Sequence, residues 1–317
     1  MTKDLGVIIP VFNEKNNLEE LLNRVLITLK NITSSFQVVI VNDGSDDGSL
    51  DLIMAFSKKH EQVNYVNLTR NYGHQVAISA GIFYSNAEAT VIIDADLQDP
   101  PELIPQLYEE YQNGFDVVNA KRKERKGESF MKRTTARLYY RLLKRLVPFE
   151  ISLDTGDYRL ISKKVVNALN TMPEQNKYLR GQIAWLGYKT TNVLYERDSR
   201  KYGESGYTYG KMFKLAIDGI TGYSDRPLWL VSRMGFVISF LSFLIILYAI
   251  FAHFVLERTI TGWTSIIVSA SFLGGIQLFS IGIIGEYIAR INTNVKRRPL
   301  FMVESSDIST TKQPPTE

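Results

Sequence analysis

The sequence predicts an α/β fold: a doubly wound, mostly parallel sheet followed by two transmembrane helices. Over the first half of the chain, apolar segments typical of buried strands alternate with segments of helical periodicity. Such alternation is typical of a parallel sheet covered by helices on both faces. Two apolar runs, each about 22 residues long, follow a more polar middle region.

The expected elements follow one another in a regular order. They are a strand at 5–11, a helix at 17–29, a strand at 36–41, a helix at 50–60, a strand at 63–68, a helix from 74, a strand ending at 94, a strand at 115–120 and a strand starting near 154. Ligands of such sheets bind beyond the carboxyl ends of the strands. Four acidic residues fall there: Glu14, Asp43, Asp94 and Asp96. No Gly-x-Gly-x-x-Gly follows the first strand, so a dinucleotide cofactor is not indicated.

An acidic turn follows the strand that ends at Asp94. Because side chains alternate along a strand, we expect Asp94 and Asp96 to project from one side. Two hard oxygen donors at the carboxyl edge of a sheet suit Mg²⁺ or Mn²⁺ holding a diphosphate. An isolated Asp-x-Asp is more often a polar turn after a buried strand, but the polar motifs after the other strands favour the metal.

Composition excludes several kinds of site. The 317 residues include no cysteine, which excludes disulfides, thiolate catalysis and cysteine-ligated metals. The three histidines are too scattered in sequence to suggest a zinc site. The formal net charge is +4, and the excess of base is uneven. The N-terminus lacks a basic stretch followed by an apolar one, so we expect no cleaved signal peptide and a cytoplasmic catalytic part.

A basic amphipathic helix is expected at about 129–147, with Arg133 and Arg137 on its basic face. Such a helix is typical of a membrane interface or a phosphate-binding surface, and an ordinary solvated face is an equally good interpretation. A polar, glycine-containing loop with Arg200 follows at 195–209, and a second surface helix is expected at about 211–223.

The C-terminal third predicts membrane spans at about 235–256 and 266–287. Buried core helices would need a large domain around them, and too few residues remain for one. Basic residues flank both outer ends, so the positive-inside rule places both termini in the cytoplasm. We therefore divide the chain into a catalytic domain at 1–228, a two-helix transmembrane domain at 229–292, and a cytoplasmic tail at 293–317 that is basic at first and disordered from Ser305.

Four motifs occur in an order and at spacings that resemble one enzyme family. They are Pro10-Val11-Phe12-Asn13-Glu14, Asn42-Asp43-Gly44-Ser45, Asp94-Ala95-Asp96-Leu97-Gln98-Asp99-Pro100-Pro101-Glu102 and Gly156-Asp157-Tyr158-Arg159. The ordered set resembles the family-2 glycosyltransferases with a Rossmann-like GT-A fold. Together with the two spans, it is most similar to the polyprenyl-phosphate glycosyltransferases, which include dolichol-phosphate mannose synthases and bactoprenol glucosyltransferases.

The resemblance implies a role for each matching residue. Those expected to bind the nucleotide sugar are Pro10, Phe12, Glu14, Asp43, Asp94 and Asp96. Those expected to hold Mg²⁺ or Mn²⁺ are Asp94, Asp96 and Gln98. Those expected to meet the acceptor phosphate are Arg122, Arg133, Arg137, Arg159 and Arg200. Asp96 and Asp157 are the expected catalytic residues, and Asp157 could act either as a base or as an orienting group.

The implied reaction is inverting transfer of a hexose to undecaprenyl or another polyprenyl phosphate at the cytoplasmic membrane face. UDP-glucose is the favoured donor, and GDP-mannose or a UDP-amino sugar is the alternative. A homo-oligomer and a lipid-linked-sugar flippase are candidate partners, and no nucleic acid is expected. A processive synthase and a non-catalytic nucleotide-binding scaffold are the rival functions. A Gln-x-x-Arg-Trp motif, usual in processive synthases, does not occur in this sequence.

Overall fold

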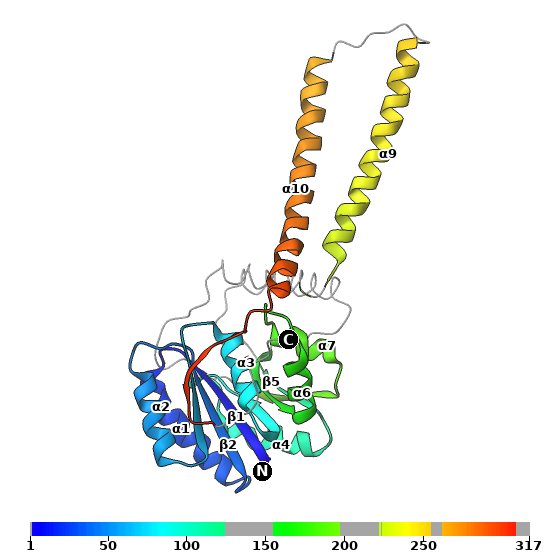
Figure 1. The fold of residues 1–317 in the computed structure, drawn as a ribbon. Helices are drawn as coiled ribbons and strands as arrows, with labels where there is room; N and C mark the ends of the chain where they lie inside the picture. Colours follow the sequence, from blue (N-terminus) through cyan, green and yellow to red (C-terminus); the bar gives the residue numbers. More distant parts are fainter. Residues whose placement is uncertain (1, 124–154, 197–221, 223, 255–261, 309–317) are drawn as a thin grey trace.

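The computed structural model describes residues 2–123, 155–196, 222, 224–254 and 262–308. They form a sheet with helices on both faces, from which two long helices project in one direction (Figure 1). The expected helices at 129–147 and 211–223 lie almost wholly outside the described residues, as do Arg133, Arg137 and Arg200.

The described sheet has eight strands in the order β7-β5-β6-β4-β1-β2-β3-β8. The strands are β1 (Lys3–Val11), β2 (Phe36–Asn42), β3 (Val63–Leu68), β4 (Ala87–Ile92), β5 (Val117–Arg122), β6 (Thr155–Ser162), β7 (Thr190–Tyr195) and β8 (Val303–Ser306). The first four strands pair in parallel, as expected for a doubly wound α/β sheet. Two strands depart from that pattern, because β6 runs antiparallel to both β4 and β5, and β8 runs antiparallel to β3. The α/β prediction is confirmed, with a mixed sheet.

Helices cover both faces of the sheet because strand side chains alternate between the faces. The helices of the sheet domain are α1 (Lys15–Lys30), α2 (Ser49–Lys59), α3 (His74–Tyr84), the 3₁₀ turn η1 (Pro101–Leu103), α4 (Ile104–Gln112), α6 (Lys163–Thr171) and α7 (Leu179–Leu186). Side chains of α1, α2 and α4 share one core with Val7 and Ile9, whereas those of α3, α6 and α7 share a second core with Ile8. This packing fixes the strand ends where the site forms.

Strand β4 ends at Ile92, before the acidic turn. The expectation that the strand runs to Asp94 is therefore wrong, and strand alternation does not govern Asp94 and Asp96. The backbone turns immediately afterwards, and Leu97 takes the left-handed conformation with φ +58°. Such a backbone is uncommon for a branched side chain and is often found at functional sites.

Two described helices, α9 (Arg226–Phe254) and α10 (Trp263–Val295), are long and apolar enough to span a membrane. Almost none of their apolar stretch is buried in the protein: the buried share is 6% for Arg226–Ile245 and 0% for Val268–Val295. A core helix would instead have its apolar residues covered. Helix α9 begins at Arg226, before the expected span at 235–256, and its described part ends at Phe254. Helix α10 extends beyond both ends of the expected span at 266–287.

The chain returns to the sheet after α10. Leu300 and Phe301 are buried in the core beside Phe83, with 6.2 Å between the Phe83 and Phe301 ring centroids. Strand β8 then adds to the β3 edge. The prediction of disorder from Ser305 onward is wrong for residues 305–308, because Ser305 and Ser306 pair with the open edge of β3 and Asp307 accepts the Tyr65 backbone N–H. Residues 309–317 lie outside the described residues.

Candidate active site

The loops after β1 and β2 are bonded to each other at the carboxyl edge of the sheet. Asn13 has φ +57°, and its side-chain amide bonds both ways with Asp46: its Nδ2 donates to the carboxylate at 2.8 Å and its Oδ1 accepts the backbone N–H at 3.0 Å. The Asn13 backbone N–H also donates to the Ser45 hydroxyl at 3.0 Å. Phe12, 47% exposed, and Glu14 lie on the first of these loops. The two predicted nucleotide-binding motifs are thus brought together, next to Pro10 at the end of β1.

Asp43 holds a third loop against these two. Its carboxylate accepts the backbone N–H groups of Tyr72 and Gly73 at 2.7 and 2.9 Å. Burial raises the pKa of Asp43 above its ordinary value, although both N–H bonds act in the opposite direction. Gly44 follows with φ +72°, and a Cβ there would stand 2.6 Å from the Asn71 backbone nitrogen. Only glycine therefore lets these two loops approach so closely.

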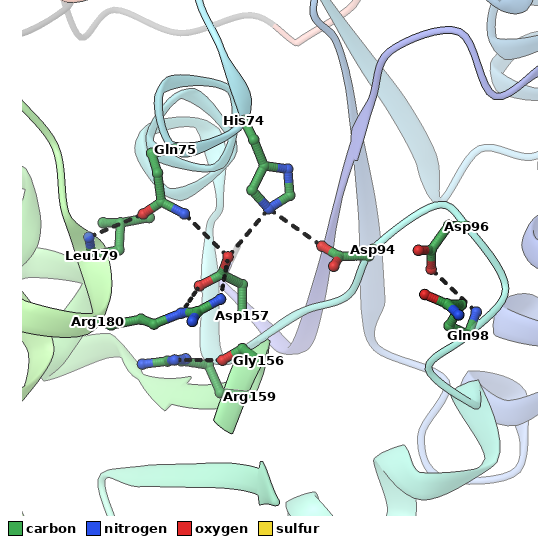
Figure 2. Close-up of polar contacts among 10 residues, drawn as sticks. All are labelled: His74, Gln75, Asp94, Asp96, Gln98, Gly156, Asp157, Arg159, Leu179 and Arg180. Atoms are coloured by element: carbon green, nitrogen blue, oxygen red, sulfur yellow. Dashed lines mark hydrogen bonds and ion pairs between the residues drawn. The ribbon is translucent and has the colours of Figure 1, made fainter. Parts of the chain in front are cut away.

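A second cluster surrounds Asp157, which is 6% exposed near the start of β6 (Figure 2). Arg180 on α7 donates to both carboxylate oxygens, from Nε at 2.8 Å and from its terminal nitrogen at 3.2 Å. Gln75 donates to the same carboxylate at 3.1 Å, and its Oε1 accepts the Leu179 N–H at 3.1 Å. His74 Nε2 lies 3.3 Å from Asp157 and 3.4 Å from Asp94. Side chains of α3 and α7 therefore converge on the Asp157 carboxylate of β6.

The charges of this cluster determine its protonation. Burial raises the pKa of Asp157, but Arg180 and His74 outweigh burial and hold that pKa well below its usual range. Burial lowers the pKa of His74, but Asp94 and Asp157 outweigh it and raise the pKa to about 9. Asp157 is therefore an anion at neutral pH whose lone pairs are already engaged. This arrangement suits an orienting group and is poorly suited to a base.

Asp94 and Asp96 point in different directions (Figure 2). Asp94 faces His74 and Asp157, whereas Asp96 folds back so that its Oδ1 accepts the Gln98 backbone N–H at 3.1 Å. Burial is the largest influence on the pKa of Asp94 and raises it, whereas His74 lowers it. The carboxylates of Asp99, Asp157 and Asp96 raise it further, so that the pKa is about 6. Such a concentration of hard, negative oxygen donors fits a divalent cation. The described residues contain no group of three or more acidic or histidine side chains arranged around one metal.

Two of the predicted phosphate-binding arginines lie within the described residues, at strand positions beside the cluster. Arg122, at the end of β5, hydrogen-bonds Tyr195, whose hydroxyl donates to Asp99. Its Nε is buried and has no hydrogen-bond partner in the described part of the chain. Arg159 is 4% exposed and donates to the Gly156 carbonyl at 2.8 Å. Arg122 thus has an unused donor for an anion, while Arg159 supports the backbone beside Asp157.

Three residues of the cluster were missed by the sequence analysis: His74, Gln75 and Arg180. His74 was considered only as a zinc ligand, and the segment that contains it was considered only as a helix start. Gly73, immediately before that helix, could have indicated a site, because its loop follows the parallel strand β3 and ligands bind beyond the carboxyl ends of such strands. The structure gives Gly73 a φ of +98°, a conformation that favours glycine. The sequence carried no comparable signal for Arg180.

Comparisons with known proteins identify the family of the chain. A model of the glycosyl transferase family 2 matches residues 6–169. An uncharacterized glycosyltransferase of Synechocystis sp. is 41% identical over 96% of this chain and 95% of its own length. The bactoprenol glucosyl transferase of Shigella phage SfII is 36% identical over 95% of this chain and 98% of its own length.

A solved structure shares the fold. Glucosyl-3-phosphoglycerate synthase from Mycobacterium tuberculosis, in complex with Mn²⁺, uridine diphosphate and glucosyl-3-phosphoglycerate, superposes with a TM-score of 0.50 and 15% identity. The match covers 69% of this chain and 78% of that one. The mixed sheet, the motifs at its carboxyl edge and the near full-length relatives together place the chain among the glycosyltransferases of family 2, with the GT-A fold.

Proposed function

We propose that this glycosyltransferase transfers one hexose from a nucleoside diphosphate sugar to a polyprenyl phosphate, with glucose from UDP-glucose as the favoured donor. The observation that carries the proposal is the joining, in one chain, of a carboxylate-lined site to two unburied helices of membrane-spanning length. Such helices would hold the site at a bilayer, where the headgroup of a lipid acceptor can reach it, and a soluble acceptor gives no reason for them. The name of the phage relative supports the same acceptor and sugar.

The reaction is a direct displacement at the anomeric carbon. An oxygen of the lipid phosphate forms the new bond to that carbon, the bond to the nucleoside diphosphate breaks, and the configuration inverts. The second pKa of a phosphate monoester is about 6, so the nucleophile is largely ionised at neutral pH. Positioning therefore matters more than proton removal. This fits an Asp157 that is held by Arg180, Gln75 and His74.

The nucleoside end of the donor is assigned to the three loops bonded around Asp43. Phe12 offers an exposed ring on one of them, and the resemblance to the family assigns Glu14 to the ribose. These residues, with Pro10, form the proposed donor pocket. Their cross-bonds hold the loops in place without a ligand, which reduces the ordering that binding requires.

Asp94, Asp96 and Gln98 are the proposed holders of Mg²⁺ or Mn²⁺. Mg²⁺ commonly binds through one or two protein carboxylates together with substrate phosphates, which suits a site without three acidic or histidine ligands among the described residues. The metal would offset the charge that develops on the diphosphate leaving group. The pKa of about 6 for Asp94 means that this carboxylate is mostly ionised at pH 7 and available to a cation.

Arg122 and Arg159, together with Arg133, Arg137 and Arg200 outside the described residues, are the proposed contacts of the acceptor phosphate. Arg122 supports the assignment best, because its buried Nε is a donor without a partner in the described part of the chain. Guanidinium groups bind phosphate with two parallel hydrogen bonds, which fixes the attacking oxygen as well as neutralising charge.

The proposed topology has two spans, with the catalytic domain and both termini on the cytoplasmic side. Basic residues at the outer ends of α9 and α10 support this orientation. The lipid-linked product would then form on the inner leaflet, so that a flippase and a second enzyme on the outer side would use it.

A donor panel tests the proposal directly. Purified full-length protein is incubated with undecaprenyl phosphate, Mg²⁺ or Mn²⁺, and each of several UDP- and GDP-sugars. The mass of the lipid product is then measured by mass spectrometry. A single added hexose supports the proposal and identifies the donor. A polymer would support a processive synthase instead, and nucleotide binding without transfer to any lipid would indicate a non-catalytic scaffold.

A further inference from the structure

We propose that Glu304, on the strand that follows the membrane helices, is a positioning residue for the nucleotide end of the site. The inference rests on the proposed donor pocket around Asp43. Glu304 lies on β8, in the segment 293–317 that the sequence analysis assigned to a C-terminal tail outside the catalytic domain. It acts through two buried amides, Asn67 and Asn42, and does not itself contact the proposed pocket.

A continuous chain of hydrogen bonds links Glu304 to the loop after β2. Its Oε2 accepts from Asn67 Nδ2 at 3.0 Å, and Asn67 Oδ1 accepts from Asn42 Nδ2 at 2.8 Å. Asn42 Oδ1 then accepts the backbone N–H of Ser45 at 3.4 Å. Both amides are buried, with exposures of 4% for Asn67 and 1% for Asn42.

The Glu304 carboxylate fixes the orientation of both amides in this series of hydrogen bonds. An ionised carboxylate can only accept hydrogen bonds, so the nitrogen of Asn67 must face Glu304 and its oxygen must face Asn42. The nitrogen of Asn42 then turns toward Asn67, which leaves its oxygen for Ser45. Without Glu304 either amide could reverse, and a reversed amide would place like groups face to face in a buried site.

An irregularity in the pairing of β8 with β3 orients the Glu304 side chain. Asn67 pairs with Ser305 and Leu68 pairs with Val303, so Glu304 is the extra residue of an irregularity in the ladder. Such a bulge re-aims a side chain relative to a regular strand. Ser45 lies two residues after Asp43, and its hydroxyl accepts the Asn13 N–H at 3.0 Å. Glu304 thus supports the position where the loops after β1 and β2 meet.

Four variants test the chain of bonds. Glu304→Leu removes the acceptor, and Asn67→Asp places two carboxylates against each other. Glu304→Gln keeps an acceptor oxygen. The double variant Asn67→Asp/Glu304→Gln restores the link in the opposite direction, since the glutamine amide donates to Asp while the other Asp oxygen still accepts from Asn42.

Full-length protein in detergent is titrated with UDP and with GDP by calorimetry, and the KM of each substrate is measured. We expect Glu304→Leu and Asn67→Asp to weaken binding of the preferred nucleotide about tenfold, with the KM of the lipid unchanged. Glu304→Gln and the double variant should stay within about threefold of the wild type.

Asp307→Ala is the matched control on the same segment. The Asp307 carboxylate accepts the Tyr65 backbone N–H at 2.8 Å and the Ser57 hydroxyl, so it attaches β8 without joining the chain to Asn42. We expect this variant to keep its nucleotide affinity. Equal losses in Asp307→Ala and Glu304→Leu would overturn the inference, as would failure of the double variant to recover. A wild-type protein that binds neither nucleotide refutes the proposed function itself, whereas unchanged affinity in Glu304→Leu refutes this inference alone.

Discussion

Replacing Asp157 with asparagine tests whether this residue orients the site or removes a proton. The wild-type carboxylate receives two hydrogen bonds from Arg180 and one from Gln75, and it lies 3.3 Å from His74 Nε2. Asparagine offers one acceptor oxygen and turns an amide donor toward groups that are themselves donors. At least one cationic partner is therefore left without its counter-charge.

The structure sets the size of the effect. Asp157 is 6% exposed and the Arg180 side chain is 26% exposed, so their pair is largely shielded from water. Breaking a buried ion pair by removing one partner costs about 3–5 kcal/mol, and we expect the lower end because Arg180 keeps some solvent. Displacing groups that position the substrates should lower kcat about 100-fold. The affinity for nucleotide should change little, because the loops around Asp43 keep their own bonds.

The assay is the pH dependence of kcat between pH 6 and 8 for the wild type and Asp157→Asn. The pKa of Asp157 lies well below its usual range, so its own charge is constant over this interval. Its loss lowers the pKa of His74, so the defect should hold steady or grow toward pH 8, and should not shrink. A base for the phosphate proton would instead matter less as the lipid phosphate ionises above its pKa of about 6. A defect that shrinks toward pH 8 would refute the orienting role.

The pH dependence of the free energy of unfolding gives a second test of the same variant. Because the folded-state pKa of Asp157 is depressed, its contribution to stability is present above the unfolded pKa of about 3.9 and is lost as the pH falls through the folded value. Asp157 also helps to raise the pKa of His74 to about 9, and that contribution is lost as the pH rises toward this value. The difference in unfolding free energy between wild type and variant should therefore be largest near pH 6, and should narrow both toward pH 9 and below about pH 4. Asp116→Asn is the control, since Asp116 bonds Ser162 at 2.9 Å outside the cluster.

Three further predictions follow from the same site and topology. Asp96→Ala should abolish transfer while the thermal unfolding midpoint stays within a few degrees of the wild type; substantial activity of the variant, or full wild-type activity in excess chelator, would contradict the assignment of Asp96 to the metal. Gly44→Ala should weaken nucleotide binding and cost about 1–3 kcal/mol of stability, because the new Cβ would lie under 3 Å from backbone atoms of Arg70 and Asn71. Gly187→Ala is the control: Gly187 also has a positive φ but has open space around it, so this variant shows the effect of backbone strain without a steric clash. Protease outside intact cells should reach a tag placed between α9 and α10 but neither terminus, and a C-terminus that is cleaved would mean that α10 does not span.

Local patterns in the sequence were enough for the fold class and for most of the motif positions. Strand and helix periodicity report burial over a few neighbouring residues, which is why β1 to β4 and their helices could be predicted. The length of the two apolar runs likewise predicted α9 and α10, since about 20 residues cross a bilayer. The carboxyl-edge rule then brought the motifs after β1, β2 and β4 to one edge without knowledge of any side-chain contact.

Tertiary structure alone decided which side chains meet. Gln75 and Asp157 are 82 positions apart, and Arg180 joins them from a third element, so no local pattern could link them. The directions of Asp94 and Asp96 depend on β4 ending at Ile92 and on the left-handed Leu97, neither of which strand alternation predicts. The pairing of β8 with β3 joins segments that lie on either side of both α9 and α10 in sequence. The sequence analysis placed that segment in a C-terminal tail, and only the packing of Leu300 and Phe301 beside an open strand edge makes it part of the sheet.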